Sequence, residues 1–237
     1  MHKLQQFDRR DATNVAERFE AHGFAVLPDV VTEPLLERIL AALPEEGDVG
    51  VRPRKWLAES WCRDVAGYLR RHPALAQIVP PTWVAVQCTL FEKSSRKNWL
   101  VSLHQDLSIP VRERVSNGGL SGWSCKDGVL FVQPPPRILE SLVALRVHLD
   151  DCGPETGALR VVPGSHRFGR LDGTRAAALR DEYGEAAPTV SRGGLLAMRP
   201  LLLHASSKAT VPSLRRVLHF VFGPPSLPLG LAWRESV

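Results

Sequence analysis

Long apolar runs are missing from this 237-residue sequence. None approaches the ~18–20 residues that a membrane-spanning helix needs. The segment from Met1 to Arg10 also lacks the apolar core of a secretory signal. We therefore expect a soluble, cytoplasmic protein with no membrane partner.

Cysteine is scarce, and its spacing argues against the common cysteine-based sites. The four cysteines lie far apart, and no pair has the C-x-x-C spacing of a zinc site or a redox motif. Free thiols in a reducing compartment are the simplest interpretation.

Runs of a single charge are absent as well. The net charge of +5 would suit an anionic substrate or a nucleic acid. However, Lys and Arg are spread through the chain, so an arginine-rich solvated surface explains the charge equally well. We expect no nucleic-acid partner, and the sequence leaves the oligomeric state open.

The sequence does contain enough apolar residues for a sizeable core, since hydrophobic residues make up 44% of the chain. A helical section at about 11–72 precedes several short apolar strands at about 82–223. This order predicts a mainly β fold with flanking helices, built as one domain over 1–237. The expected helices follow Asp11 and Thr32 and cover 55–71 and 176–182, and the expected strands cover 24–28, 82–91, 139–149, 158–162 and 215–222.

The segment 102–106, Ser-Leu-His-Gln-Asp, places the imidazole of His104 and the carboxylate of Asp106 two residues apart. On a strand, these two side chains point to the same side. His204 ends a distant apolar run, 201–203, and offers a third ligand. Two histidines and one carboxylate are the set that holds non-haem Fe(II).

A second triplet of the same form, His148-Leu149-Asp150, competes with the first. It lies where the strand expected over 139–149 runs into a polar turn. We interpret His148 as a structural or pocket-lining residue, because a lone histidine is more often either of these than a ligand.

The order His-x-Asp, distant His, then Arg resembles the Fe(II)/2-oxoglutarate dioxygenases, since Arg215 follows His204 by eleven residues and opens an apolar strand. The pattern in 150–166 of two aspartates, a glycine turn, a short strand and Pro-Gly-Ser-His resembles the phytanoyl-CoA hydroxylase family. His104 lies 100 residues before His204 and His148 only 56, and the spacing of that family selects the first triplet.

The resemblance implies a double-stranded β-helix, or jelly-roll, core with an N-terminal helical section. It also implies an enzyme that uses Fe(II), 2-oxoglutarate and O2 to hydroxylate a C–H bond of a small-molecule substrate, with release of succinate and CO2. Its site residues would be, for the metal and catalysis, His104, Asp106 and His204 and, for 2-oxoglutarate, Arg215, Ser206 and Gln87.

Two other functions stay open. One is a non-catalytic jelly-roll protein that only binds a metal. The other is a dioxygenase of the nucleic-acid-repair type, although those enzymes usually carry a second, spaced arginine in the last motif, whereas Arg215 and Arg216 are adjacent.

The segment 107–136 is rich in glycine and proline and shows no clear periodicity. Because it follows two expected metal ligands directly, we predict that it is a mobile lid over the site. Its candidate contact residues are Trp123 and the basic residues Arg112, Arg114 and Lys126, which favour an anionic substrate.

Overall fold

The computed structural model describes residues 15–44 and 56–237. The expected helix start at Asp11 and the first residue of the helix expected over 55–71 therefore lie outside the described residues. The α-helices are α1 (Val15–His22), α2 (Glu33–Ala42), α3 (Ser60–Arg71), α4 (Pro136–Glu140) and α5 (Gly173–Tyr183), and the short 3-10 helices are η1 (Trp56–Ala58), η2 (Pro73–Leu75), η3 (Pro154–Thr156) and η4 (Ser165–Phe168).

Local sequence signals explain where several helices begin and end. Gly23 ends α1 with a φ of +78° and donates its N–H to the carbonyl of Phe19 at 2.8 Å. Asp172 caps α5, because its side chain accepts a hydrogen bond from the N–H of Arg175 at 2.8 Å. Thr32 precedes α2 as expected, but its side chain makes no capping hydrogen bond.

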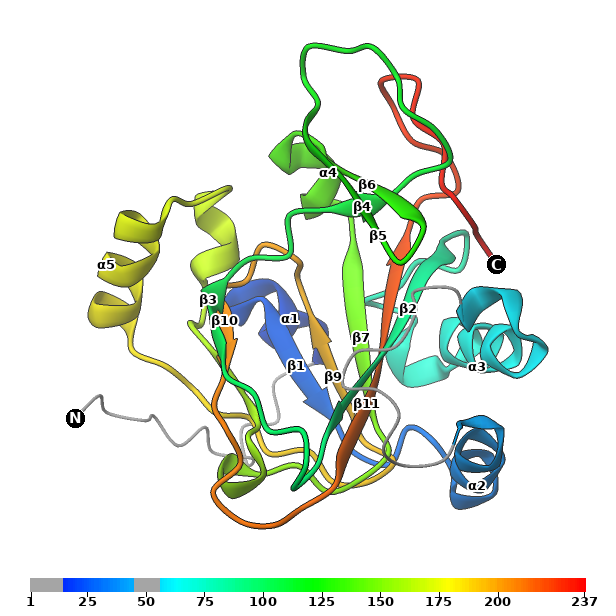
Figure 1. The fold of residues 1–237 in the computed structure, drawn as a ribbon, viewed down its shortest axis with the longest axis vertical. Helices are drawn as coiled ribbons and strands as arrows, with labels where there is room; N and C mark the ends of the chain where they lie inside the picture. The colour runs from blue at the N-terminus through cyan, green and yellow to red at the C-terminus, as the bar shows by residue number, and fades with distance from the viewer. Residues whose placement is uncertain (1–14, 45–55) are drawn as a thin grey trace.

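The largest sheet is antiparallel and has five strands in the order β1-β9-β7-β11-β2 (Figure 1). These strands are β1 (Phe24–Leu27), β2 (Val84–Lys93), β7 (Val143–His148), β9 (Leu195–Met198) and β11 (Arg215–Gly223). The short N-terminal strand β1 thus joins the core sheet at its edge by pairing with β9.

The two faces of this sheet have different roles. On β11, Leu218 and Phe220 belong to the apolar core that α1, α2 and α3 cover. Arg215 and His219 alternate with these residues and therefore point to the opposite face, which lines a cavity. The two-residue period of one strand thus places apolar side chains under the helices and polar side chains in the cavity.

A second, three-stranded sheet closes the other side of the cavity. It consists of β3 (Val101–His104), β10 (His204–Ser206) and β8 (Leu159–Val161), in the order β3-β10-β8. Together the two sheets form the double-stranded β-helix that the sequence predicted, with α5 lying beside β3 (Figure 1).

The third sheet lies within 107–136, the segment that shows no clear periodicity in the sequence, so this segment is not a plain loop. The sheet consists of β4 (Ile109–Pro110), β5 (Ser121–Lys126) and β6 (Val129–Gln133), in the order β4-β6-β5. Most of β5 is exposed, which removes the apolar alternation that would have revealed it. The buried residues Val129, Phe131 and Val132 attach β6 to the body of the protein.

The strand expected over 139–149 begins only at Val143. Pro136 starts the one-turn helix α4, which is too short to show a 3.6-residue apolar period, and Leu139 is buried as part of that helix. The earlier start was therefore wrong because buried apolar runs in a short helix and a strand look alike.

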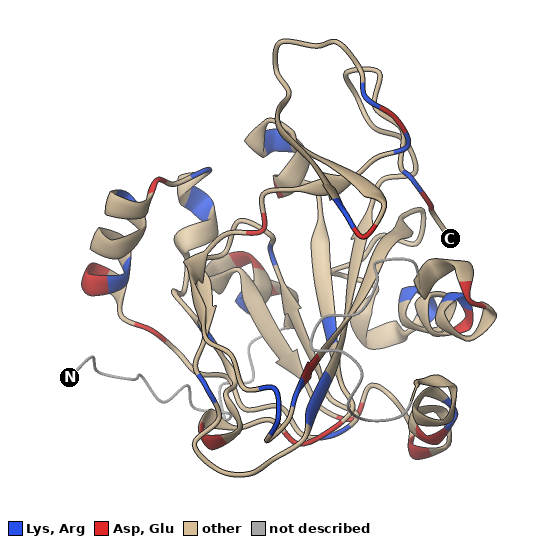
Figure 2. Ribbon diagram, in the orientation of Figure 1, with Lys and Arg blue, Asp and Glu red and all other residues tan. Residues whose placement is uncertain are grey.

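Charged residues of both signs are interspersed over the helices and loops (Figure 2). Within 15–44 and 56–237, none of the helices combines the length and the apolarity that crossing a bilayer requires.

Candidate metal centre

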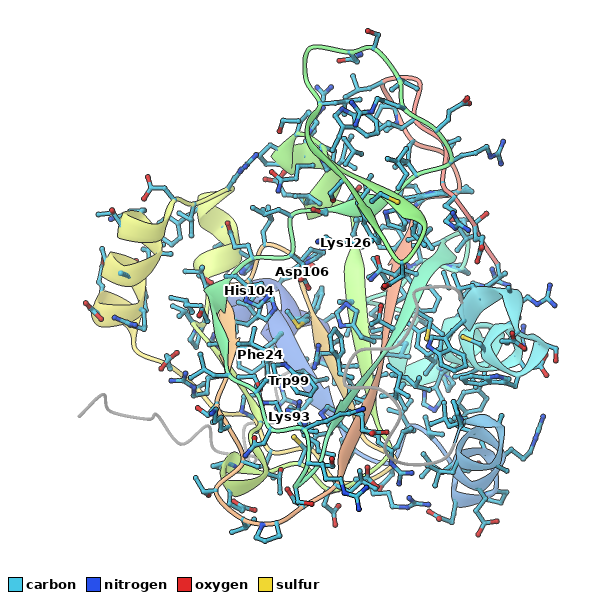
Figure 3. The ribbon with its side chains drawn as sticks, viewed as in Figure 1. Phe24, Lys93, Trp99, His104, Asp106 and Lys126 are labelled. Atoms are coloured by element: carbon cyan, nitrogen blue, oxygen red, sulfur yellow. The ribbon has the colours of Figure 1, made fainter. Side chains whose placement is uncertain are left out.

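His104 and Asp106 reach the cavity from one extended segment. His104 is the last residue of β3, and Asp106 follows it just beyond the strand, where its N–H donates to the carbonyl of Pro200 at 2.9 Å. Nε2 of His104 lies 3.9 Å from Oδ1 of Asp106. The two side chains therefore converge, as their spacing predicted (Figure 3).

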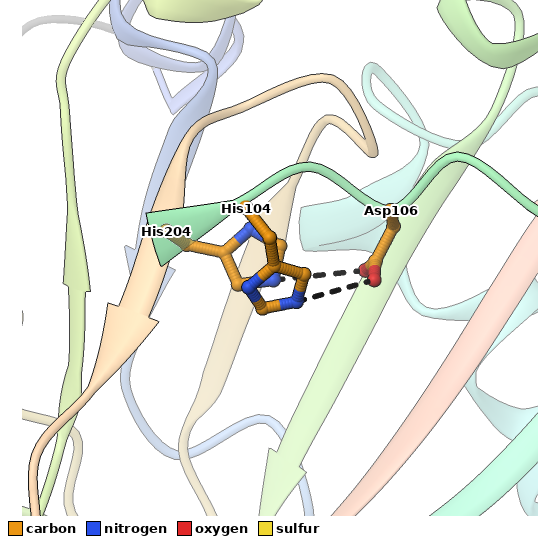
Figure 4. Close-up of side chains that lie close together, drawn as sticks. All are labelled: His104, Asp106 and His204. Atoms are coloured by element: carbon orange, nitrogen blue, oxygen red, sulfur yellow. Dashed lines mark ion pairs between the residues drawn. The ribbon is translucent and has the colours of Figure 1, made fainter. Parts of the chain in front are cut away.

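His204 completes the cluster from the neighbouring strand. It begins β10 and pairs in register with His104, so that the two imidazole centroids are 4.2 Å apart. Nε2 of His204 lies 3.9 Å from Oδ2 of Asp106 (Figure 4). One ligand atom from each of the three residues lies within 4.8 Å of the others.

Backbone carbonyls orient both imidazoles. Nδ1 of His104 lies 2.8 Å from the carbonyl of Ser102, and Nδ1 of His204 lies 2.8 Å from the carbonyl of Leu202. Because a carbonyl only accepts hydrogen bonds, each Nδ1 carries the hydrogen, and the neutral ring keeps its Nε2 lone pair for a metal.

The protonation states suit the same role. Burial would raise the pKa of Asp106, but His204, His219, His104 and Arg146 together lower it below its usual range. Burial lowers the pKa of His204 to about 4, against the opposing pull of Asp106. At neutral pH, the cluster therefore offers a carboxylate and a neutral imidazole.

The two carboxylate–imidazole distances within the cluster are compatible with one shared cation. The carboxylate–imidazole separations of 3.9 Å exceed hydrogen-bond length. Two ligand atoms that each lie about 2.1 Å from a metal can be at most about 4.2 Å apart, so a single ion between them can reach both. The donor set of two imidazole nitrogens and one carboxylate oxygen is the one that Fe(II) takes in non-haem sites.

The turn formed by the Pro-Gly-Ser-His motif at 163–166 supports the segment that carries His204. Gly164 has a φ of +77°, which allows the turn in the Pro-Gly-Ser-His motif. The hydroxyl of Ser165 in this motif accepts a hydrogen bond from the N–H of Leu203 at 2.8 Å. His166 packs over Gly23, where a Cβ would lie only 2.4 Å from its ring. The motif therefore supports the chain directly before His204.

The competing triplet has other partners. Nδ1 of His148 lies 3.0 Å from the carbonyl of Arg146. Asp150 accepts two hydrogen bonds from the guanidinium of Arg216, at 2.9 and 2.7 Å, on the side of β11 away from the cavity. These contacts give His148 and Asp150 a structural role, as we interpreted for His148.

The cluster of His104, Asp106 and His204 opens into a cavity of about 390 Å³, a size within the range of small-molecule sites. Arg215 lines one end of it and is 3% exposed. Its guanidinium donates to the carbonyl of Gly157 and, among the described residues, forms no ion pair with a carboxylate. A buried cation without an acidic partner marks this end as a place for an anion.

Lys93 adds a second cation near Arg215, because the two residues are paired across the neighbouring strands β2 and β11. Its Nζ donates to the hydroxyl of Ser206 at 2.8 Å and to the carbonyl of Ser207. Burial and the nearby charge of Arg215 lower the pKa of Lys93 to about 8. Sequence inspection did not single out Lys93, because only the strand register brings it beside Arg215.

Ser206 and Gln87 both line the cavity but at different places. The hydroxyl of Ser206 lies at the cationic end, where it accepts from Lys93 and donates to the carbonyl of Gly157 at 3.0 Å. Gln87 pairs in register with Val221, six residues along β11 from Arg215, and donates to the hydroxyl of Thr89 at 3.2 Å. The structure therefore brings Ser206, and not Gln87, close to Arg215.

The third sheet forms the opposite end of the cavity. Of the four candidate contact residues in 107–136, Lys126 lines the cavity, and its ammonium lies 5.7 Å from the centre of the Phe131 ring. Arg114 instead stacks on Trp123 at 5.1 Å, and neither residue lines this cavity.

Two further titratable residues of the cavity were missed from the sequence. Arg146 and His219 lie on neighbouring strands as register partners, and both are buried. Burial, with a further contribution from Arg215, lowers the pKa of Arg146 to about 10, so it stays charged at neutral pH. No short motif contains these two residues. The only available signal in the sequence was that His219 lies on the same face of the predicted strand 215–222 as Arg215.

Comparisons with known proteins agree with this geometry. A family model described as phytanoyl-CoA dioxygenase matches residues 19–217. No curated protein matches the chain significantly by sequence.

Three similar solved structures share the fold. SnoN, a non-haem α-ketoglutarate-dependent epimerase from nogalamycin biosynthesis, has a TM-score of 0.66 and 16% identity, covering 93% of this chain and 87% of SnoN. AviO1 from Streptomyces viridochromogenes has a TM-score of 0.61 and 24% identity, and the match covers 94% of this chain and 99% of AviO1. HygX from Streptomyces hygroscopicus, solved with nickel and 2-oxoglutarate, has a TM-score of 0.61 and 20% identity, and the match covers 92% of this chain and 87% of HygX.

Proposed function

The chain belongs to the phytanoyl-CoA dioxygenase family, and on this premise we propose that it is an Fe(II)- and 2-oxoglutarate-dependent dioxygenase that hydroxylates a C–H bond of a small molecule. The products would be the hydroxylated substrate, succinate and CO2. One observation carries the proposal: the cluster of His104, Asp106 and His204 shares a cavity with the guanidinium of Arg215, which has no carboxylate partner among the described residues.

Each part of the cavity has a defined task in this proposal. His104, Asp106 and His204 would hold Fe(II), which, when bound with 2-oxoglutarate and O2, supplies the oxidising chemistry. Arg215 would receive the far carboxylate of 2-oxoglutarate, since its planar guanidinium suits a carboxylate. Ser206, whose hydroxyl accepts a hydrogen bond from Lys93, would lie beside that carboxylate.

The substrate would enter from the other end of the cavity. That end is largely apolar and includes Ile109, Phe131, Leu139 and Leu142. Apolar walls exclude water from the reacting carbon and position it by contact. SnoN and HygX have also been solved with small molecules, nogalamycin RO and hygromycin B respectively, and we propose that a small molecule occupies the corresponding end here. Lys126 at its rim would favour an anionic group on the substrate.

The test is reconstitution of the purified protein with Fe(II) and 2-oxoglutarate under anaerobic conditions, followed by exposure to O2 with a panel of small molecules. We expect succinate to form in proportion to a product that has gained one oxygen atom. Succinate without any gain of oxygen in the product would favour another outcome, such as desaturation, which removes two hydrogens, or epimerisation, which leaves the composition of the substrate unchanged. Binding of Fe(II) and 2-oxoglutarate without succinate would support a non-catalytic protein, and turnover of single-stranded oligonucleotides would support the repair alternative.

The depressed pKa of Lys93 predicts a pH dependence for 2-oxoglutarate binding. The protonated ammonium adds positive charge near the far carboxylate and is lost as the pH rises through about 8. The affinity for 2-oxoglutarate should therefore fall above pH 8, by at most about tenfold per pH unit for one proton. Calorimetry with the Ni(II)-loaded protein from pH 6.5 to 9.5 would measure this.

Two Lys93 variants provide the control for this pH series. Lys93→Arg should bind 2-oxoglutarate with little change up to pH 9.5, because an arginine stays charged there. Lys93→Met should bind it weakly at every pH. A decline above pH 8 that is equal in the wild-type protein and in Lys93→Arg would show that another group titrates.

The position of Lys126 predicts an effect on the substrate alone. Lys126→Ala should raise the KM of an anionic substrate and increase the succinate formed per product, because the substrate is held less firmly while 2-oxoglutarate binds as before. Arg114→Ala is the matched control, since Arg114 lies in the same segment but outside the cavity. Equal effects of the two substitutions would contradict a specific role for Lys126.

Hydrogen exchange would test whether 107–136 is also mobile. We expect its amide protection to increase when substrate binds, as for a lid that closes. Equal protection with and without substrate would leave the segment as a fixed wall.

A further inference from the structure

A third histidine faces the metal cluster from the large sheet. His219 lies on β11, and its Nε2 is 4.0 Å from Oδ2 of Asp106. Its Nδ1 lies 3.0 Å from a terminal guanidinium nitrogen of Arg146, its register partner on β7. His219 and Arg146 are 5% and 6% exposed, so water does not replace these contacts easily.

Arg146 determines which nitrogen of His219 carries the hydrogen. A guanidinium only donates hydrogen bonds, so Nδ1 of His219 must accept. The ring hydrogen then lies on Nε2, the nitrogen that faces Asp106. His219 therefore presents a donor to the carboxylate, whereas His104 and His204 present lone pairs to the same space.

An aromatic ring holds this pair in place. Phe91 on β2 meets the ring of His219 edge-on, with centroids 5.7 Å apart and an interplanar angle of 86°. The guanidinium of Arg146 lies over the same Phe91 ring at 5.3 Å. Contacts from two neighbouring strands thus fix the direction of the Nε2–H bond before any ligand binds.

We propose that His219, oriented by Arg146, is a positioning residue that holds Oδ2 of Asp106 and thereby fixes the direction in which this carboxylate would meet the metal. The inference deepens the proposed function and rests on it. A movement of about 1 Å closes the 4.0 Å separation to hydrogen-bond length, and Asp106 has that freedom because its side chain is 39% exposed. Without this contact, the carboxylate can turn away from the two imidazoles and present its oxygens less well to a metal.

Two substitutions at one position separate the donor from the bulk of the side chain. His219→Gln keeps an oxygen that accepts from Arg146 and an N–H that reaches toward Asp106. His219→Met fills similar space but donates nothing. We expect the anaerobic Fe(II) affinity, measured by calorimetry, to fall about 10–100-fold in His219→Met, as for other residues that orient metal ligands, and to stay near the wild-type value in His219→Gln.

A double substitution tests the route through Arg146. Arg146→Met removes the group that keeps the hydrogen on Nε2, so it should weaken Fe(II) binding in the same direction. Because both residues act through one contact, the Arg146→Met/His219→Met protein should bind Fe(II) no more weakly than the weaker single variant. Independent roles would instead give effects that multiply.

Phe220→Leu controls for general loss of stability. Phe220 is the next residue on β11 but points into the apolar core on the other face. The Phe220→Leu substitution should lower the unfolding temperature without changing the Fe(II) affinity. Equal Fe(II) affinities of the wild-type, His219→Met and His219→Gln proteins would overturn the inference while leaving the proposed function intact, as would an equal loss in both His219 variants. A wild-type protein that binds no Fe(II) would overturn both.

Discussion

Asp106→Ala is expected to lose more than about 100-fold in Fe(II) affinity and to form no succinate above background. Residues that only orient a metal ligand already contribute about 10–100-fold, and removal of the one carboxylate in the cluster should exceed this. The loss also leaves His104, His204 and Arg146 around a site without negative charge. Anaerobic calorimetry and a succinate assay would measure the two effects.

Asp150→Asn is the matched control for this experiment. Asp150 ends the second His-x-Asp triplet and pairs with Arg216 away from the cavity. Its substitution should reduce the unfolding temperature through the lost ion pair but leave Fe(II) affinity unchanged. If Asp150→Asn lost the metal and Asp106→Ala kept it, the choice between the two triplets would be reversed.

Arg215→Ala is expected to weaken 2-oxoglutarate binding by about 2–5 kcal/mol, the usual loss when one partner of a buried charge pair is truncated. This corresponds to a factor of roughly 30 or more in the dissociation constant. The reason is geometric, because Arg215 lines the cavity and has no carboxylate of the described chain to neutralise it. Calorimetry of 2-oxoglutarate with the Ni(II)-loaded protein would measure the change.

Arg216→Ala provides the comparison from the adjacent position. Its side chain points to the other face of β11, where it pairs with Asp150 at 2.7 Å. We expect lower stability and an unchanged affinity for 2-oxoglutarate. A larger loss of affinity in Arg216→Ala than in Arg215→Ala would mean that the two side chains have exchanged faces.

The sequence predicted the parts of the site whose geometry follows from position along one strand. His104 and Asp106 share a side because they are two residues apart, and Arg215 and Arg216 differ in face because they are adjacent. The long buried strand that carries Arg215 was equally clear from its apolar residues. In each case, a local period was sufficient to give the direction of a side chain.

Contacts between strands could not be predicted in this way. Lys93 lies beside Arg215, and His219 beside Arg146, only because β2, β11 and β7 pair in one register. The role of Gln87 stays a prediction, since it lines the cavity but pairs with β11 at a position six residues from Arg215. The β5–β6 hairpin was missed because its exposed strand has no apolar pattern.

The charges around the cavity lead us to expect that binding of 2-oxoglutarate stabilises the folded protein. Lys93, Arg146 and Arg215 lie within or just behind the walls, and among the described residues that line the cavity only Asp106 is acidic. A dicarboxylate relieves this mutual repulsion, and a ligand at 100 times its dissociation constant stabilises a folded protein by about 2.7 kcal/mol. Proteases in the cell remove the unfolded fraction, so we expect the abundance of this protein to rise and fall with the supply of 2-oxoglutarate.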